Sequence, residues 1–208
     1  MRNLVRRSFV FVFFALVCAA PAFGGTILFL GDSLTAGLGV EPAQAYPALI
    51  QEKILEKNLP FDVINAGISG DTSAGGLARL DWVLQKKIDF LVLALGANDG
   101  LRGLPVAQMK TNLQGIIDRV KAKNPSVKIV IAGMQIPPNL GAEFSATFVA
   151  VFADLARENQ AALVPFLLEG VGGQVDLNQA DHIHPTAAGH KVVAENVWRV
   201  LEPLLKVD

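Results

Sequence analysis

The stretch T-I-L-F-L-G-D-S-L-T, from Thr26 to Thr35, decides the fold. Its apolar run stops at Gly31, and Asp32 and Ser33 follow at once. A short apolar run that ends in Gly predicts a buried strand entering a tight turn. In an open α/β sheet, ligands bind just past the carboxyl ends of the strands, so we expect the Ser33 hydroxyl at the mouth of a site. Because Gly, Asp and Ser are also ordinary turn residues, this stretch alone leaves open whether the motif is only a turn.

Strand-like and helix-like segments alternate through the rest of the chain. Short apolar runs predict strands at 27–30, 61–64, 90–95, 127–132 and 162–164. Apolar residues at helical spacing predict helices at 44–57, 72–85, 106–123, 143–158 and 185–204. This alternation predicts a parallel sheet covered on both faces, which right-handed crossovers make a three-layer α/β/α sandwich. We expect one doubly wound domain whose five strands have the flavodoxin-like order 2-1-3-4-5.

The composition is typical of one compact domain and argues against a nucleic-acid partner. Of the 208 residues, 51% are hydrophobic and 18% charged, which is the balance of a globular chain with a good-sized core. A net charge of −1 provides no basic surface for nucleic acid. We expect a monomer that acts on a small molecule and needs no cofactor.

The first 22 residues have the layout of a secretory signal peptide. Three arginines among the first seven residues precede an apolar run over 8–20, and small residues continue to Ala22. The run is shorter than the roughly 20 residues of a membrane-spanning helix, so we expect cleavage after Ala22 rather than an uncleaved anchor or stable membrane insertion. The mature domain, 23–208, would be periplasmic or secreted. It would lack Cys18, the only cysteine, and therefore any disulfide or thiol nucleophile.

Polar residues gather in the segments that follow the predicted strands. Ser33 follows the first strand, Gly70 the second and Asn98 the third, while Asp181 and His184 come after the fifth. Because the carboxyl ends of parallel strands meet at one edge of a sheet, we expect these residues to converge. A hydroxyl, an imidazole, a carboxylate and amide donors are together the parts of a serine hydrolase.

Each of these five residues has a role in that chemistry. Ser33 is the candidate nucleophile, and His184 is the base that would take its proton. Asp181, three residues before His184, can fix the imidazole tautomer and stabilise the imidazolium. The N–H groups of Ser33 and Gly70 and the side-chain amide of Asn98 are the candidate oxyanion donors. Taken singly, Asp181 and Asn98 could be turn formers, and Gly70 a flexible backbone position.

His182 and His184 also form a His-x-His pair, which is a weak signal for a metal site. A metal would leave Ser33 and Asn98 without a role, and the sequence offers no third convincing ligand. We therefore expect no metal. His182 is interpreted as incidental, on the expectation that its ring points away from that of His184.

Four blocks of sequence resemble those of the SGNH, or GDSL, hydrolases. They are G-D-S-L at 31–34, the glycine loop around Gly70, G-A-N-D at 96–99 and D-x-x-H-P at 181–185, in that order. The resemblance places the Ser, Gly, Asn and His of the family on Ser33, Gly70, Asn98 and His184, with the triad Asp on Asp181.

The similarity is strongest to a bacterial periplasmic group of acyl-CoA thioesterases, lysophospholipases and arylesterases, through 65–80, 96–103 and M-Q-I-P-P-N at 134–139. It implies a secreted serine esterase that hydrolyses fatty acyl esters and thioesters through an acyl-enzyme.

Apolar residues after the third and fourth strands predict a shallow groove for an acyl chain, with packing beneath the loops as the alternative. The predicted lining residues are Leu101, Ile136, Pro137, Pro138 and Leu140. Each methylene buried in such a groove contributes about 0.8 kcal/mol, which grades chain lengths gently and gives a broad substrate range. Two alternatives remain for the chain as a whole: a carbohydrate O-acetylesterase on the same fold, and a periplasmic binding module without turnover.

Overall fold

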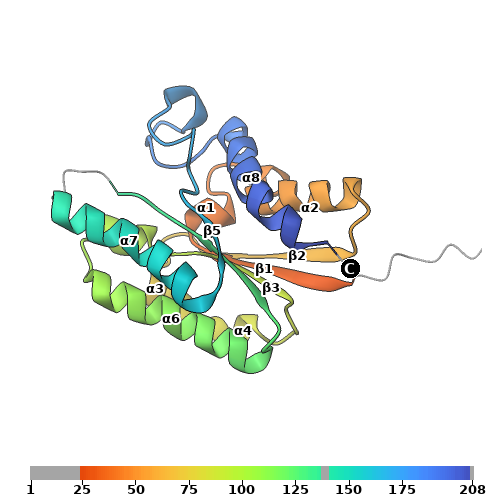
Figure 1. Ribbon diagram of the computed structural model, residues 1–208. Helices are drawn as coiled ribbons and strands as arrows, with labels where there is room; N and C mark the ends of the chain where they lie inside the picture. Colours follow the sequence, from red (N-terminus) through yellow and green to blue (C-terminus); the bar gives the residue numbers. More distant parts are fainter. Residues whose placement is uncertain (1–23, 137–140, 207–208) are drawn as a thin grey trace, which may run out of the picture.

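The computed structural model describes residues 24–136 and 141–206. A five-stranded parallel sheet lies between two layers of helices (Figure 1). The strands follow the order β2-β1-β3-β4-β5, which confirms the predicted order 2-1-3-4-5. The strands are β1 (Gly25–Gly31), β2 (Phe61–Gly67), β3 (Phe90–Ala94), β4 (Lys128–Ala132) and β5 (Ala162–Val164).

Helices cover both faces of the sheet. In Figure 1, α1, α2 and α8 lie on one side of it, and α3, α4, α6 and α7 lie on the other. The helices are α1 (Ser33–Ala36), α2 (Tyr46–Glu56), α3 (Ser73–Ala78), α4 (Leu80–Val83), α5 (Ala97–Leu101), α6 (Val106–Lys123), α7 (Ala142–Asn159) and α8 (Ala187–Leu201). Short 3₁₀ turns at Pro42–Gln44, Val175–Leu177 and Glu202–Leu204 complete the described elements.

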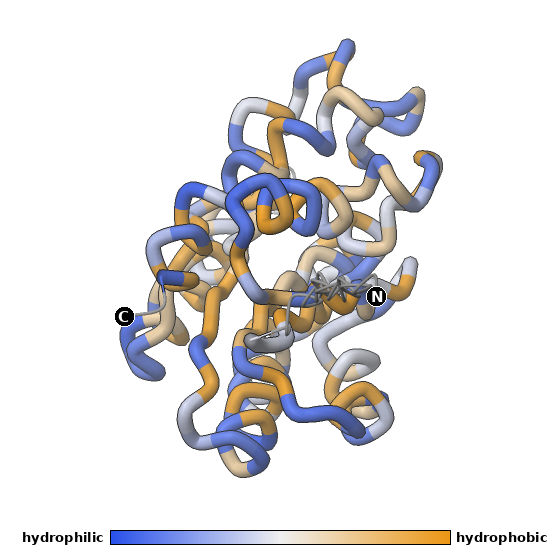
Figure 2. Tube along the Cα trace, turned by 90° about the vertical axis from the view of Figure 1, so that its right-hand side faces the viewer, coloured by the Kyte–Doolittle hydropathy of each residue, from blue (hydrophilic) through white to orange (hydrophobic). Residues whose placement is uncertain are grey.

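The core lies along the central strands, which are apolar on both faces. Ile27, Leu28, Phe29 and Leu30 of β1 are each 0% exposed, and all five residues of β3 are buried. A parallel sheet with helices on both faces requires such continuous apolar strands. In Figure 2, hydrophobic segments run through the interior, and hydrophilic ones gather at the outer turns. The sheet is therefore a rigid platform whose carboxyl edge can hold polar groups in fixed positions.

The helix predicted at 72–85 is wrong as a single element, because it is divided at Arg79 into α3 and α4. Arg79 has φ −93° and ψ 2°, and it is both the last cap of α3 and the first cap of α4. Its side chain leaves the helix surface and reaches the carbonyl groups at the ends of two strands. The sequence pattern does not reveal this bend, because leucines recur at helical spacing both before and after Arg79.

Several other boundaries differ from the predictions by a few residues, and two of these differences bear on the site. The segment from Gly96 to Gly100, for which no helix is predicted, is mostly helix α5, because Gly96 turns the chain out of β3 with φ +114° and a helix follows directly. The last long helix begins at Ala187 rather than Pro185, because the hydroxyl of Thr186 caps it by accepting from the Gly189 N–H. Pro185 stays outside that helix, in a bridge with Asn178.

Within the described ranges, the structure has no helix long and apolar enough to cross a membrane. The predicted signal peptide at 1–22, with Cys18, lies outside these ranges.

Candidate active site

Ser33 lies at the turn between β1 and α1, at the carboxyl edge of the sheet. Gly31 ends the strand, Asp32 caps the helix by accepting a hydrogen bond from the Leu34 N–H at 3.0 Å, and Ser33 is the first helical residue. A Cβ atom at Gly31 would lie 1.9 Å from the Thr35 hydroxyl oxygen, so the turn is tight enough to need glycine there. The turn presents the Ser33 side chain at the rim of the sheet, with 9% of the residue exposed.

A continuous chain of hydrogen bonds joins Ser33, His184 and Asp181. The Nε2 atom of His184 lies 2.9 Å from the Ser33 Oγ, although the two residues are 151 positions apart in the sequence. Its Nδ1 atom lies 2.6 Å from Oδ2 of Asp181. A hydroxyl, an imidazole and a carboxylate in this order can lower the barrier to proton removal from the hydroxyl.

Asp181 also organises the backbone of its own turn. Its Oδ1 atom accepts hydrogen bonds from the N–H groups of Ile183 at 3.1 Å and His184 at 3.0 Å. Chiefly the backbone N–H of His184, and then its ring, lower the pKa of Asp181 to about 2. The carboxylate is therefore ionised at neutral pH and faces the imidazole as an anion.

Gln179 ties the histidine-bearing turn to the segment that follows Ser33. Its N–H donates to the His184 carbonyl at 2.7 Å, and its side-chain amide donates to the carbonyl oxygens of Leu38 at 2.7 Å and Pro185 at 2.9 Å. A Cβ atom at Gly39 would lie 2.1 Å from the Gln179 Oε1, so Gly39 leaves room for this contact. Gln179 thus couples the loop after β1 to the loop before α8.

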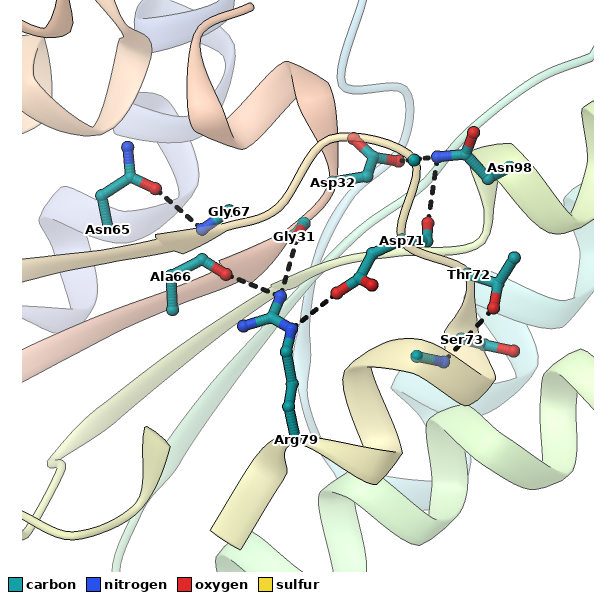
Figure 3. Close-up of polar contacts among 12 residues, drawn as sticks. Gly31, Asp32, Asn65, Ala66, Gly67, Asp71, Thr72, Ser73, Arg79 and Asn98 are labelled. Carbon is teal, nitrogen blue, oxygen red and sulfur yellow. Dashed lines mark hydrogen bonds and ion pairs between the residues drawn. The ribbon is translucent and has the colours of Figure 1, made fainter. Parts of the chain in front are cut away.

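The Asn98 amide lies between the loops that follow β1 and β2 (Figure 3). Its Nδ2 atom donates to the Asp71 carbonyl oxygen at 2.9 Å and approaches Oδ2 of Asp32 at 3.4 Å. Gly70 precedes Asp71 with φ +83°, a conformation that favours glycine, and its carbonyl accepts from the Arg102 guanidinium at 2.8 Å. The structure therefore connects Gly70 and Asn98 through the intervening Asp71.

Asp32 is a buried carboxyl group at the centre of this arrangement, with 1% of the residue exposed. Burial raises its pKa to about 6, and the hydrogen bond from the Leu34 N–H opposes that shift only in part. Asp32 therefore changes between its protonated and its ionised form near pH 6, whereas Asp181 is already ionised at that pH.

An apolar cavity of about 460 Å³ opens beside the Ser33 hydroxyl. Ser33, Asn98 and His184 lie in its wall. Its apolar lining comprises Leu34, Leu101, Met134, Ile136, Phe166, Leu168 and Ile183, among others. This volume is within the range of about 300–1,000 Å³ that is usual for small-molecule sites.

The comparisons with known proteins agree with this geometry. The sequence model described as "GDSL-like Lipase/Acylhydrolase family" matches residues 29–192. "Esterase TesA" of Pseudomonas aeruginosa is 44% identical over 181 residues, which cover 86% of this chain and 89% of that protein. "Thioesterase 1/protease 1/lysophospholipase L1" of Escherichia coli K12 is 36% identical over 207 residues, which cover 99% and 97% of the two chains.

A solved structure gives the same result at the level of the fold. The psychrotrophic esterase EstA from Pseudoalteromonas sp., inhibited by monoethylphosphonate, superposes with a TM-score of 0.81 at 34% identity, covering 87% of this chain and 98% of that one. The chain belongs to the GDSL-like lipase/acylhydrolase family. The predicted family, the fold class and the assignment as a hydrolase are confirmed.

The predicted acyl groove of this GDSL hydrolase is only partly within the described residues. Leu101 and Ile136 line the cavity, whereas Pro137, Pro138 and Leu140 lie outside the described ranges. Sequence reasoning missed Phe166 and Leu168, which line the cavity from the segment after β5. The sequence of that segment shows no periodic spacing of apolar residues, and its only recognisable motif is the D-x-x-H-P block.

The spacing of His182 and His184 does not support the expectation that their rings point away from each other. His182 lines the same cavity as His184, at a left-handed position with φ +63°. Residues two apart share a face even in an extended strand, and this segment is a turn. The described ranges contain no group of three or more His, Cys, Asp or Glu residues that could hold a metal ion.

Proposed function

We propose that this GDSL hydrolase is a secreted serine esterase that hydrolyses fatty acyl esters and thioesters through an acyl-enzyme on Ser33. The observation that carries the proposal is the hydrogen-bonded chain from Asp181 through His184 to Ser33 at the mouth of an apolar cavity. The relatives named esterase and thioesterase/lysophospholipase support the same bond types.

In the acylation step, the Ser33 Oγ attacks the carbonyl carbon of the substrate while Nε2 of His184 takes its proton. Asp181 holds the other ring nitrogen and stabilises the imidazolium that forms. The carbonyl oxygen becomes an oxyanion, which the N–H groups of Ser33 and Gly70 and the Asn98 amide stabilise. The tetrahedral intermediate collapses as His184 returns the proton to the leaving alcohol or thiol, and the acyl group stays on Ser33.

Deacylation repeats these steps with water as the nucleophile. His184 removes a proton from water, the hydroxide attacks the acyl-Ser33 carbonyl, and the fatty acid leaves as Ser33 recovers its proton. Neither half-reaction needs a metal or an organic cofactor, since all proton transfers run through His184.

The apolar lining of the cavity supports an acyl chain as the group that is bound. A chain buried among Leu101, Ile136 and Phe166 gains about 0.8 kcal/mol per methylene. Lysophospholipids are included in the proposed range because a relative is named lysophospholipase L1, and aryl esters because the sequence resembles arylesterases. An O-acetylated sugar would gain little from this lining, so octanoyl esters should be hydrolysed faster than acetylated sugars.

The decisive variant is Ser33→Ala. We expect its kcat on a chromogenic short-chain ester to fall by at least about 10⁴-fold, because no hydroxyl remains to form the acyl-enzyme. Ser126→Ala is the matched control, since Ser126 precedes β4 at the opposite edge of the sheet. A Ser33→Ala protein with wild-type turnover would overturn the proposal.

Covalent labelling separates the esterase from a binding module. A fluorophosphonate probe should label the wild-type protein on Ser33 and leave Ser33→Ala unlabelled, because only an activated hydroxyl attacks the phosphorus atom. A wild-type protein that binds an acyl ester but resists both hydrolysis and labelling would be a binding module.

Export is the remaining part of the proposal. Expression of the full chain in a bacterial host should yield a mature protein that begins at Phe23 and fractionates with the periplasm or the medium. Mass determination of the intact product would show whether residues 1–22 have been removed.

A further inference from the structure

Arg79 lies beneath the loops that carry the proposed oxyanion donors. Its guanidinium, at the junction of α3 and α4, makes three hydrogen bonds (Figure 3). Nε donates to Oδ2 of Asp71 at 2.6 Å, and Nη2 donates to the carbonyl oxygens of Ala66 at 2.7 Å and Gly31 at 3.1 Å. The side chain is 14% exposed, so these contacts are largely shielded from water. One cation therefore joins the carboxyl ends of β1 and β2 to the loop that follows β2.

Asp71 extends this connection to Asn98. Its carboxylate accepts from Arg79, and its backbone carbonyl accepts from the Asn98 amide at 2.9 Å. A Cβ atom at Gly75 would lie 2.5 Å from Oδ1 of Asp71, so the carboxylate packs directly against α3. A displacement of the Asp71 side chain would therefore also move the carbonyl that orients Asn98.

A second buried carboxylate fixes the other end of this loop. Asp99, 3% exposed, accepts from the Ser73 N–H at 2.7 Å and from the Ser73 hydroxyl at 2.6 Å. The Asn112 amide donates to the same hydroxyl at 3.0 Å. Because Asp99 follows Asn98 directly, the start of α3 and the start of α5 are held together. The Asp71 carbonyl lies between these fixed points, and the Asp71 side chain connects it to Arg79.

We propose that Arg79 is a positioning residue that sets the orientation of the Asn98 oxyanion donor through Asp71, an inference that rests on the proposed function. It holds the Ser33 turn through the Gly31 carbonyl, the Gly70 loop through Ala66 and Asp71, and the Asn98 amide through Asp71. The guanidinium suits this task because its donors diverge in a rigid plane, whereas the ammonium of lysine is one compact charge on a flexible stem. The described residues show no contact of Arg79 with the cavity, so it acts through the donors and not on the substrate.

The test is a double-mutant cycle between Arg79→Lys and Asn98→Ala, measured on a short-chain p-nitrophenyl ester. We expect Arg79→Lys to lower kcat by about 10–100-fold with KM within about 2-fold, because misplaced donors weaken only transition-state binding. Asn98→Ala should lower kcat by about 10²–10³-fold. If Arg79 acts through Asn98, the double variant should lie within about 3-fold of Asn98→Ala alone.

A transition-state analogue gives a readout that a loss of stability would not move. Octylboronic acid forms a tetrahedral adduct with an activated serine, whereas octanoate resembles the ground state of the product. Arg79→Lys should weaken octylboronic acid binding by the same factor as it lowers kcat/KM and leave octanoate binding unchanged. Arg157→Lys is the matched control, because Arg157 pairs with Asp154 on the surface of α7, and its kcat should be that of the wild type.

Three results have distinct meanings. Wild-type kcat in Arg79→Lys, or fully additive losses in the cycle, would overturn this inference and leave the proposed function intact. Wild-type kcat in Asn98→Ala would overturn the oxyanion assignment and this inference with it. If Arg79→Lys does not fold, Asp71→Asn replaces it, since asparagine retains the volume and the backbone carbonyl. Its kcat should fall several-fold without adding to Asn98→Ala, and an unchanged kcat would overturn the inference.

Discussion

At the scale of the residue, the nucleophile turn buries the carboxyl group of Asp32, and this burial disfavours its charged form. The Gly-Asp-Ser motif reads from the sequence as a turn followed by a nucleophile. The folded chain instead buries the Asp32 carboxyl between the Leu34 N–H and the Asn98 amide. Its pKa rises to about 6 from an ordinary value of 3.8 because water is excluded. The proton is thus held more tightly in the folded state than in the unfolded state.

The variant Asp32→Asn tests this assignment. A raised carboxyl pKa stabilises the fold at low pH, and that stabilisation is lost as the pH rises through about 6. From about pH 4 to pH 7, the unfolding free energy of the wild type should fall by about 2 kcal/mol relative to Asp32→Asn, which cannot titrate. Urea unfolding across this range measures the difference. Parallel stability curves for the two proteins would contradict the assignment.

At the scale of the element, the close fit of α1 against β2 holds the nucleophile turn in place. Gly67 ends β2 opposite Gly31 in the ladder. A Cβ atom there would lie 2.2 Å from the Ala36 backbone nitrogen and 2.7 Å from the Thr35 carbonyl carbon. Both neighbours are backbone atoms and cannot rotate away as a flexible side chain could.

We therefore expect Gly67→Ala to destabilise the protein by about 1–3 kcal/mol and to lower kcat, because α1 carries Ser33 and must shift. Gly115→Ala is the matched control. Gly115 lies within α6, where a Cβ atom would meet only Leu77 carbons at 3.5 Å. That variant should be more stable than the wild type by about 0.5–1 kcal/mol, because alanine favours the helix. Equal urea midpoints for the two variants would refute this account.

The elements differ in how far the sequence predicts them. The strands could be predicted because buried parallel strands are nearly continuous apolar runs, as in Ile27 to Leu30. The bend between α3 and α4 could not be predicted. It lies at Arg79, whose side chain bonds to backbone carbonyl oxygens, and the pattern of side chains in a sequence does not indicate such bonds. The same reason kept Arg79 and Gln179 out of the predicted site.

At the scale of the whole molecule, His190 is a second buried titratable group, and its effect on stability changes with pH in the direction opposite to that of Asp32. His190 of α8 accepts from the Tyr46 N–H at 3.3 Å, and the Tyr46 hydroxyl lies 2.8 Å from that of Thr35. The path links the C-terminal helix to α2 and to the helix of the nucleophile. Burial lowers the pKa of His190 to about 4, so the folded state binds this proton less tightly than the unfolded state does. Its contribution and that of Asp32 change in opposite directions over the same pH range.

The variant His190→Gln should reveal a stability that changes with pH in the direction opposite to that expected for Asp32. A lowered histidine pKa gives stability that is complete above about 6.5 and is lost as the pH falls towards about 4. Between about pH 7 and pH 4, the wild type should lose about 3 kcal/mol relative to His190→Gln, even though glutamine lowers the stability at neutral pH. Urea unfolding at each pH measures this. A constant difference between the two proteins would show that His190 keeps its ordinary pKa.

The meeting of the polar blocks could be predicted at this scale, because parallel strands bring their carboxyl ends to one edge. The placement of Ser33 near His184 followed from that rule together with the residue types and the family resemblance. The cavity wall at Phe166 and Leu168 could not be predicted, because it is built by an irregular segment whose position depends on how β5 and α8 pack.

The separation of 151 positions between Ser33 and His184 also bears on when the enzyme becomes active. During synthesis the nucleophile Ser33 is made long before its base His184, and α8, which follows the histidine turn, is the last long helix of the described chain. No nascent chain short of His184 holds a complete proton-transfer chain. The proton-transfer chain can therefore be completed only when nearly the whole chain has been synthesised.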